Sequence, residues 1–244
     1  QRTGEIAGSS TKEVPLPDSE ALVKERCDLQ QHGGPDDEVQ YSCPENNLVL
    51  GHRRLALLDL TSAGHQPMIY QDRYVISFNG EIYNFKELKN VLLEKGHSFK
   101  SESDNEVILH LYEEYGEHCV KYLEGMFAFV IYDIKQETLF LARDRVGEKP
   151  LYYITDQSGF YFSSEIKSFY KMDNFSKKIS AQGLDAYFNY IQIPSPQTIF
   201  EGVKKVRPAH WLKINSDGAE STLAYWQVNC INKTPSTLGD AKNN

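Results

Sequence analysis

Two stretches of the chain place apolar residues at helical spacing directly behind residues that favour a helix start. Asn84 and Ser103 each precede a glutamate by three positions, which is the spacing of a capping box. The helices that they begin are expected to end at Gly96 and Gly116, because glycine readily adopts the left-handed conformation that closes many helices. The apolar stripes are Phe85, Leu88, Val91 and Leu92 in the first helix and Val107, Ile108, Leu111 and Tyr112 in the second.

Two further segments carry helical patterns. One runs from Ser19 to Gln31 and stops before His32-Gly33-Gly34-Pro35, whose glycines and proline interrupt a helix. The other runs from Ala181 to Tyr190 and is ended by Ile193-Pro194-Ser195-Pro196, because proline cannot continue a helix.

The remaining regular patterns are typical of β-strands. Tyr74 to Phe78 is predicted to be a buried strand that runs into Asn79-Gly80, a dipeptide suited to a tight turn. Consecutive antiparallel strands are predicted over 126–134, 138–142, 151–154 and 159–163, and a last hairpin over 209–214 and 223–227. Strands that precede and follow helices in this way predict an α+β layered domain.

Composition narrows the classes of protein to which the chain can belong. Its 244 residues, 40% of them hydrophobic, allow one sizeable core, so one domain with a tail is expected. The net charge of -8 argues against non-specific nucleic-acid binding, which needs a surplus of Lys and Arg. No apolar run has the length of a membrane span and no signal-peptide core is present, so we expect a cytoplasmic protein.

Neither the cysteines nor the histidines have the spacing of a known site. The four cysteines form no Cys-x-x-Cys pair, so reduced thiols are expected rather than disulfides or a zinc knuckle. No histidine has a metal-like spacing with a carboxylate partner, so His52, His65 and His110 are interpreted as core or surface residues and no metal is expected. Arg143 and Asp144 are interpreted as an ion pair or a hydrogen-bonded corner without a catalytic role.

A series of short motifs follows a fixed order along the chain. The motifs are Leu50-Gly51-His52-Arg53-Arg54-Leu55-Ala56-Leu57-Leu58-Asp59-Leu60, Gln66-Pro67-Met68, Asn79-Gly80-Glu81-Ile82-Tyr83-Asn84, Ser103-Asp104-Asn105-Glu106, Gly125-Met126-Phe127-Ala128-Phe129 and Ala142-Arg143-Asp144-Arg145-Val146-Gly147-Glu148-Lys149-Pro150. In this order and spacing the set resembles the N-terminal glutaminase domain of glutamine-hydrolysing asparagine synthetases, which are class II glutamine amidotransferases. The resemblance extends from about Ile6 to Trp226.

The resemblance implies a fold and a domain organisation. The fold is the N-terminal-nucleophile hydrolase-like four-layer αββα sandwich of two antiparallel sheets. Residues 1–227 would form the amidotransferase-like domain, and 228–244 a linker or tail toward a synthetase domain absent from this chain. No Ser-Gly-Gly-x-Asp-Ser loop for pyrophosphate occurs, so no cofactor is expected here, and ATP and Mg²⁺ are expected only in that synthetase domain.

The resemblance also implies roles for individual residues. In such a domain an N-terminal Cys attacks the carboxamide of glutamine with its own α-amine as base, and water hydrolyses the thioester that forms. Asn79 and the backbone N–H of Gly80 would form the oxyanion hole, and Arg54 would pair with the α-carboxylate. The remaining glutamine contacts would come from Glu81 and Asp104, which would hold the α-ammonium, and from the backbone at Leu57 and Leu58.

Each of these residues also has a structural interpretation. Asn79-Gly80 alone would suit a hairpin turn, and Arg54 with Arg53 would suit a surface pair. Asp104 would stabilise the first turn of a helix through the helix dipole, and Glu81 would suit a solvated surface. The combination of motifs favours the ligand interpretation, because packing alone does not require the whole set.

The chain departs from the family at the nucleophile. The family begins with Cys-Gly-Ile-Ala-Gly, whereas this chain reads Thr3-Gly4-Glu5-Ile6-Ala7-Gly8, so Gly4 occupies the nucleophile position and has no side chain. The arginine of the family's His-Arg-Gly-Pro-Asp-Asp motif is replaced by Gly33. Cys27 and Cys43 are interpreted as buried thiols rather than as replacement nucleophiles.

Thr3 is an alternative nucleophile. If Gln1 and Arg2 were removed, Thr3 would head the chain and Glu5 would be an insertion. Threonine with its own amine is a known nucleophile–base pair. The chain begins with Gln1 rather than Met, which indicates an N-terminus that is processed, trimmed or engineered.

The sequence therefore predicts the glutamine amidotransferase domain of an asparagine synthetase-like protein, in which glutamine would supply ammonia for amide transfer to aspartate. Because the N-terminal Cys is missing, we expect this chain to be unable to hydrolyse glutamine itself. The alternative is a non-catalytic glutamine-binding or scaffold domain, as in β-lactam synthetase-like proteins. The expected partners are glutamine and a C-terminal synthetase domain in cis or in trans, with a homodimer as one alternative and no nucleic acid or membrane.

Overall fold

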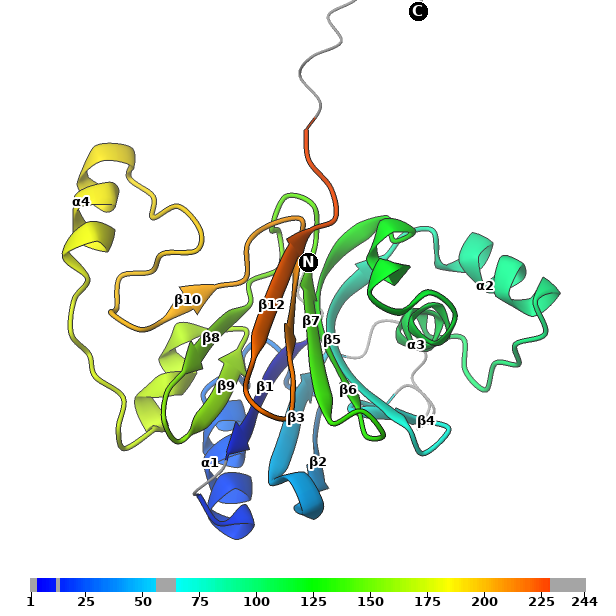
Figure 1. Cartoon of the computed structure of the whole chain (residues 1–244), viewed down its shortest axis with the longest axis horizontal. Helices are drawn as coiled ribbons and strands as arrows, with labels where there is room; N and C mark the ends of the chain where they lie inside the picture. The colour runs from blue at the N-terminus through cyan, green and yellow to red at the C-terminus, as the bar shows by residue number, and fades with distance from the viewer. Residues whose placement is uncertain (1–3, 12–13, 56–64, 229–244) are drawn as a thin grey trace, which may run out of the picture.

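Two antiparallel sheets face each other in the structure, a computed structural model that describes residues 4–11, 14–55 and 65–228 (Figure 1). The first sheet has the spatial order β10 (Lys204–Lys205), β8 (Tyr152–Thr155), β9 (Gly159–Ser163), β1 (Glu5–Thr11), β3 (Leu48–Arg54), β2 (Asp37–Cys43). The second has the order β12 (Glu220–Ala224), β11 (His210–Ile214), β7 (Thr138–Arg143), β6 (Gly125–Asp133), β5 (Tyr74–Ile82), β4 (Met68–Tyr70).

Helices cover the outer faces of both sheets. On the first sheet, α1 (Leu16–Asp28) buries Val23 and Cys27 against Ala7 and Val49. On the second, α2 (Phe85–Glu94) and α3 (Asp104–Tyr115) cover the outer face of β5 and β6 (Figure 1). The other helices are α4 (Ala181–Tyr190) and the short 3-10 helices η1 (Pro44–Asn46), η3 (Gly116–Lys121) and η4 (Ile166–Lys171). The layers confirm the predicted αββα sandwich.

The main core lies between the two sheets. Side chains alternate along each strand, so Val75 of β5 points into the inter-sheet core while its neighbours Ile76 and Phe78 pack toward α3. The facing sheet contributes Ile6 of β1 and Phe162 of β9. Because β5 is buried on both faces, its first residues, Tyr74 to Ile76, are apolar without alternation, and the polar Ser77 and Asn79 that follow are buried as well.

The strand predictions are correct locally and wrong in one pairing. The predicted strands from residue 126 to 163 exist, but the chain leaves the second sheet after β7 and enters the first sheet at β8, so those two strands do not pair. The last strand, β12, ends at Ala224 rather than at Gln227. The sequence patterns did not reveal β1 to β4 or β10, which are short or rich in small and polar residues.

The predicted turn at Asn79-Gly80 is wrong. Strand β5 continues to Ile82, which pairs with Gly125 of β6. A Cβ atom at Gly80 would lie 2.2 Å from the carbonyl oxygen of Met126, so the glycine permits a close backbone approach within the sheet.

The two capping boxes are also wrong in detail, although both helices exist. Neither Asn84 nor Ser103 caps its helix with its side chain. Asn84 instead bonds the carbonyl of Tyr122 and the N–H of Glu124, directly before β6. In α4, Ser180 is a true cap, and its Oγ accepts a hydrogen bond from the N–H of Gly183.

Three cysteines within the described ranges, Cys27, Cys43 and Cys119, are buried free thiols, as predicted for the first two. Burial raises the pKa of Cys27 to about 12, which disfavours its nucleophilic thiolate form. None of the helices within 4–11, 14–55 and 65–228 has the length and apolar character needed to cross a membrane.

Candidate functional site

The start of β1 is the point at which the chain departs from the family pattern. Strand β1 pairs with β3 on one side and β9 on the other, and Glu5 lies opposite Arg53 of β3. Gly4 has a φ of +106°, and a Cβ atom there would lie 2.7 Å from the carbonyl oxygen of Arg53. A side chain at residue 4 would therefore be strained within this continuing chain.

The carboxylate of Glu5 reaches across to the second sheet. Its Oε2 accepts a hydrogen bond of 3.3 Å from Nδ2 of Asn79, and it also bonds with Ser164. The pKa of Glu5 is raised to about 7. Burial is the main cause, and the negative charge of Glu165 contributes in the same direction. The bond with Ser164 and the positive charges of Lys149 and Lys167 act in the opposite direction.

Gly33 provides the space that the Glu5 side chain fills. A Cβ atom at Gly33 would lie 2.4 Å from Cγ and 2.6 Å from Oε1 of Glu5. Any larger residue at position 33 would therefore displace this side chain. The two departures from the family pattern, at the N-terminus and at position 33, are thus parts of one local arrangement.

Asn79 lies on β5 and is almost fully buried. Besides Glu5, its Nδ2 contacts Oγ of Ser164 at 3.4 Å, and that hydroxyl also accepts the N–H of Ile6. The amide donor that the resemblance assigns to the oxyanion hole therefore faces the start of β1, where the family has its nucleophile.

A buried histidine joins the two sheets beside this point. Nε2 of His52 on β3 lies 3.0 Å from the carbonyl oxygen of Phe78 on β5. Burial lowers the pKa of His52 to about 4 although this hydrogen bond opposes the shift, so the ring is neutral near pH 7. The link places Arg54 and Gly80, each two residues further along, at the same end of the sandwich.

Asp104 stands at the N-terminus of α3 and contacts the end of β5. Its Oδ2 accepts a hydrogen bond of 3.0 Å from the N–H of Ile82. Burial raises its pKa to about 6, and the negative charge of Glu81 adds to this, while backbone N–H groups of Ile82, Asp104 and Asn105 oppose it. The Asp104 carboxylate thus accepts hydrogen bonds both from the first residues of α3 and from the end of β5, and it lies near the carboxylate of Glu81.

The structure brings most of the predicted site residues to one end of the sandwich. Arg54, Asn79, Gly80, Glu81 and Asp104 all lie there, on β3, β5 and the start of α3. Leu57, Leu58 and Thr3 fall outside the described residues.

Sequence reasoning missed Glu5, Ser164 and Lys149. The available signal was a charged residue, Glu5, at a position where the family has glycine next to its nucleophile. Ser164 follows directly after β9, so it reaches Asn79 only because β9 pairs with β1.

Arg143 and Asp144 form the predicted hydrogen-bonded corner. The Arg143 guanidinium donates to the carbonyl groups of Lys149, Gly147 and Val206. The Asp144 carboxylate accepts backbone N–H groups of this same loop and of Phe127. The corner fixes the loop that carries Lys149 toward Glu5.

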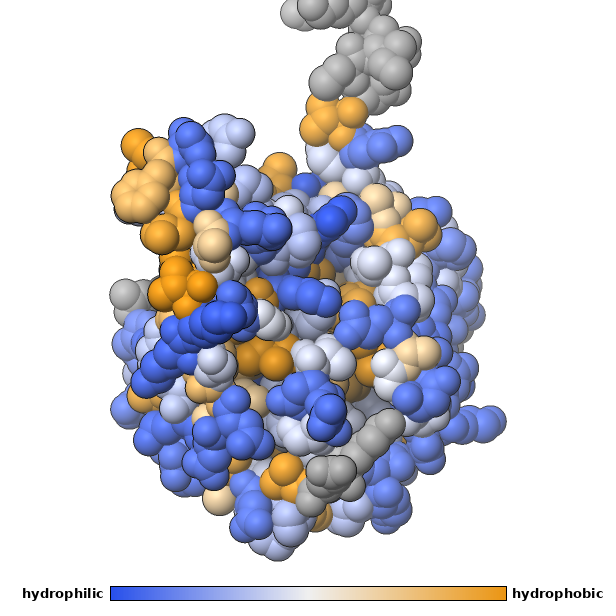
Figure 2. Space-filling model, turned by 60° about the vertical axis from the view of Figure 1, so that its left-hand side comes forward, coloured by the Kyte–Doolittle hydropathy of each residue, from blue (hydrophilic) through white to orange (hydrophobic). Residues whose placement is uncertain are grey.

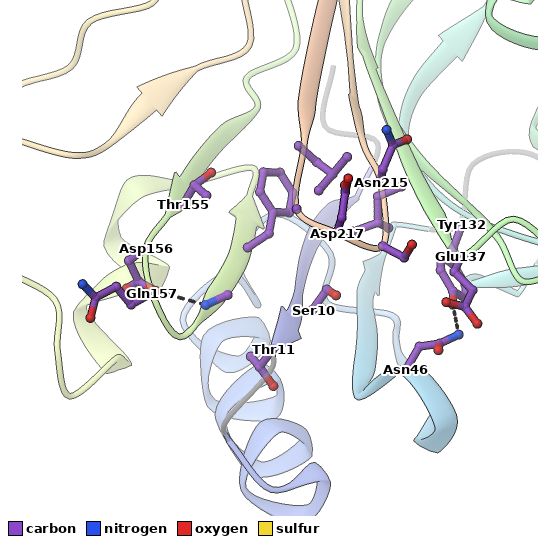
Figure 3. A pocket seen from close by; sticks show the side chains of 16 residues that line it. Ser10, Thr11, Asn46, Tyr132, Glu137, Thr155, Asp156, Gln157, Asn215 and Asp217 are labelled. Carbon is purple, nitrogen blue, oxygen red and sulfur yellow. Dashed lines mark hydrogen bonds between the residues drawn. The ribbon is translucent and has the colours of Figure 1, made fainter.

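A cavity of about 390 Å³ lies at the other end of β1 (Figure 3). It is lined by Ser10 and Thr11 and by three hairpin turns that contribute Glu137, Asp156 and Asp217. Because Glu5 begins β1 and Thr11 ends it, this cavity is separate from the candidate site.

Comparisons with known proteins agree with the sequence and the fold. Residues 5–226 match the family model of the glutamine amidotransferase domain. The chain is 41% identical over 207 residues to glutamine-hydrolyzing asparagine synthetase 3 of Bacillus subtilis, an alignment that covers 83% of this chain and 33% of that protein. It is 39% identical over 221 residues to the putative glutamine-hydrolyzing asparagine synthetase 2 of Methanocaldococcus jannaschii, covering 81% and 42%.

Among solved structures, the glutamine phosphoribosylpyrophosphate amidotransferase of Bacillus subtilis superposes with a TM-score of 0.65 at 17% identity, covering 92% of this chain and 50% of that chain. This likeness confirms the fold. The chain spans about a third of the length of the Bacillus relative, so the comparisons concern one domain of a longer protein. Its sequence and its sandwich place the chain in the family of glutamine amidotransferase domains found in glutamine-hydrolysing asparagine synthetases.

Proposed function

We propose that this chain is the amidotransferase domain of an asparagine synthetase-like protein and that it does not itself hydrolyse glutamine. The observation that carries the proposal is the hydrogen bond from Asn79 Nδ2 to the Glu5 carboxylate, next to a nucleophile position occupied by Gly4. An oxyanion hole acts only when its donors face the oxygen on which negative charge develops. The Glu5 side chain occupies that donor, and where Glu5 is ionised, above its raised pKa of about 7, its charge also opposes a second anion.

Binding of the amino-acid end of glutamine is a separate part of the proposal. We assign the α-carboxylate to Arg54, whose guanidinium suits bidentate pairing. We assign the α-ammonium to the neighbourhood of Glu81 and Asp104. The support is electrostatic, because the charge of Glu81 raises the pKa of Asp104 and a bound cation would relieve this repulsion.

The decisive experiment compares glutamate release by the native chain and by a restored chain. The restored chain begins with Cys at position 4 and carries Glu5→Gly and Gly33→Arg. It starts at residue 4 because a first residue has no φ to strain, whereas Gly4→Cys inside the longer chain would be strained. We expect no release by the native chain, whose N-terminus is checked by mass, and measurable release by the restored chain.

Asn79→Ala in the restored chain supplies the control. Loss of one oxyanion donor is expected to lower its kcat by about 10²–10³-fold. Glutaminase activity of the native chain would overturn the proposal and would point to Thr3 or to another group as nucleophile. A restored chain that folds but releases no glutamate would show that the assigned pocket is wrong.

Glutamine binding is tested by melting temperature. Because Glu5 occupies Asn79, Glu5→Gly is expected to melt at a higher temperature with millimolar glutamine, and to respond more strongly than the native chain. Arg54→Ala in the same background should remove the response. A response that survives Arg54→Ala would contradict the assignment of the α-carboxylate.

The partner that we assign is a synthetase domain docked on α4. Four apolar residues of this helix and its end, Leu184, Tyr187, Phe188 and Ile191, repeat at helical spacing and are exposed, Phe188 by 76% and Ile191 by 83%. The helix projects from the body of the molecule (Figure 1), and apolar atoms gather on that projection (Figure 2). The Bacillus relative is in total more than twice as long as this chain. Its additional residues are a candidate for the domain that covers such an apolar face.

The compartment that we assign is the cytoplasm, where thiols stay reduced. The free thiols of Cys27, Cys43 and Cys119 support this assignment.

A further inference from the structure

Two histidines and a glutamate meet beneath the helical layer of the second sheet, on the part of α3 that follows the candidate-site residue Asp104. His97 follows α2, and His110 and Glu113 lie on consecutive turns of α3. One ligand atom from each of the three lies within 4.8 Å of the other two. Tyr70 of β4 joins them, with its hydroxyl 3.1 Å from Nδ1 of His110 and 2.8 Å from Oε2 of Glu113.

The outer nitrogen of each histidine faces a carboxylate. Nε2 of His97 lies 3.0 Å from Oε1 of Glu114. Nε2 of His110 faces Oε1 of Glu106 at 3.7 Å. Glu106 accepts hydrogen bonds from Ser101 and from the N–H of Lys100, which stabilise its charged form. The Glu114 carboxylate favours a proton on Nε2 of His97, and the charge of Glu106 favours one on Nε2 of His110, although that nitrogen has no partner within hydrogen-bond distance among the described residues.

With both protons on the outer nitrogens, the lone pairs of the two Nδ1 atoms point at each other. These atoms are only 2.8 Å apart, and Oε2 of Glu113 lies 3.7 Å from Nδ1 of His97. Two lone pairs and a carboxylate at such distances repel one another unless a proton or a metal ion lies between them, and a proton between the two rings would leave the Glu113 carboxylate uncompensated, whereas a metal ion would satisfy all three groups. A histidine whose other nitrogen donates to a carboxylate is the usual state of a metal ligand.

We propose that Nδ1 of His97, Nδ1 of His110 and Oε2 of Glu113 bind a zinc ion, with a water beside the Tyr70 hydroxyl as the fourth ligand. Zinc–ligand distances of about 2.0–2.2 Å in a tetrahedron require ligand atoms about 3.3 Å apart. The two Nδ1 atoms are 2.8 Å apart, Nδ1 of His97 and Oε2 of Glu113 are 3.7 Å apart, and all three ligand atoms lie within 4.8 Å of one another, so side-chain adjustments of up to about an ångström would bring them to that value. Imidazole with carboxylate is a ligand set that suits Zn²⁺.

The metal would connect three elements that meet only here. His97 leads out of α2, His110 and Glu113 belong to α3, and the Tyr70 hydroxyl belongs to the edge strand β4. The proposed role is structural, because the ion would fix the helical layer on the second sheet. Sequence spacing did not reveal it, since only His110 and Glu113 are close in the sequence, three residues apart on α3, while His97 comes from a separate segment.

The test uses the whole chain, stripped with EDTA and dialysed. Titration with Zn²⁺ in a calorimeter is expected to show one strong site per chain, and a raised melting temperature should accompany it. Co²⁺ in place of zinc should give the visible spectrum of a four-coordinate ion. His97→Ala and Glu113→Gln should each weaken zinc binding at least tenfold, and the matched control His118→Ala, on an exposed histidine of η3, should leave it unchanged.

Melting curves of each variant in EDTA establish that it is folded before its zinc affinity is interpreted. The proposal is overturned if the stripped chain takes up no zinc at micromolar concentration, or if Co²⁺ is six-coordinate. It is also overturned if both ligand variants bind as tightly as the native chain, because the metal would then lie elsewhere. None of these readouts depends on glutamine, so the result is independent of the proposed function.

Discussion

At the scale of the residue, the proposed loss of glutaminase activity rests on the contact between Glu5 and Asn79. Glu5 replaces a glycine of the family pattern, and its carboxylate takes the donor that a reacting glutamine would need. The sequence predicted the loss at Gly4 and the change at Gly33. It did not predict the role of Glu5, because the direction of that side chain depends on how β1 pairs with β3 and β9.

The raised pKa of Glu5 predicts an unusual pH dependence of stability. Glu5 keeps its proton up to about pH 7 in the folded chain and loses it near 4.5 in the unfolded chain. Folding therefore loses stability, on the order of 2 kcal/mol, as the pH rises from 4.5 through 7. Glu5→Gln lacks this loss, so in urea unfolding it should be more stable than the native chain at about pH 8 and similar at about pH 4.5. A constant difference between the two curves would contradict this account of Glu5.

At the scale of the element, α4 combines good local signals with an unusual surface. Its sequence prediction from 181 to 190 is correct to the residue, because Ser180 caps it and Pro194 lies shortly beyond its end. Strand β1 could not be predicted in the same way. Its Ala7, Gly8 and Ser9 carry little β-propensity, and only pairing on both sides makes them a strand.

The end of α4 predicts opposite effects on stability and on docking. Ile191 has a φ of +55° in the left-handed region, which is costly for a β-branched residue. Ile191→Gly should relieve about 1 kcal/mol of strain and slow amide exchange in α4. In a protein that joins this chain to the proposed synthetase domain, the same change should weaken the contact between them, seen as faster separation of the two domains by limited proteolysis. Leu223→Ser, at an exposed apolar residue of β12, serves as the control. If the native protein, Ile191→Gly and Leu223→Ser are cleaved equally fast, α4 is not part of the interface.

At the scale of the whole molecule, the two sheets are joined by side chains as well as by their core. The carbonyl of Phe78 contacts His52 of the other sheet, and its N–H donates to the buried Gln66 side chain. The order of motifs predicted this sandwich, because it resembles that of a family with this fold. Strand patterns alone did not, because nothing in the segment between β7 and β8 marks the change of sheet, which is imposed by the hydrogen-bonded corner at Asp144.

The link between the sheets should be measurable as global stability. His52→Leu leaves the buried Phe78 carbonyl without this partner and should lower the free energy of unfolding by about 1–3 kcal/mol at pH 7. Ser77→Ala, which removes a weak 3.5 Å contact to Gly51, should have a much smaller effect. The stability advantage of the native chain over His52→Leu should shrink as the pH falls from 6.5 to 4, because the unfolded His52 takes up a proton and the folded one does not. Urea unfolding checks both, and equal losses in the two variants would show that the bond is unimportant.

The contact between Gly33 and Glu5 restricts the order in which this site was able to change during evolution. Glutamate at position 5 beside any larger residue at position 33 would clash, since even a Cβ atom would approach Glu5 Cγ to 2.4 Å. Glycine at position 33 beside glycine at position 5 leaves only empty space, which a lineage can tolerate. We therefore expect that the arginine was lost before the glutamate took its present position. Among present-day relatives, glutamate at position 5 should always occur together with glycine at position 33, whereas glycine at position 33 should also occur alone.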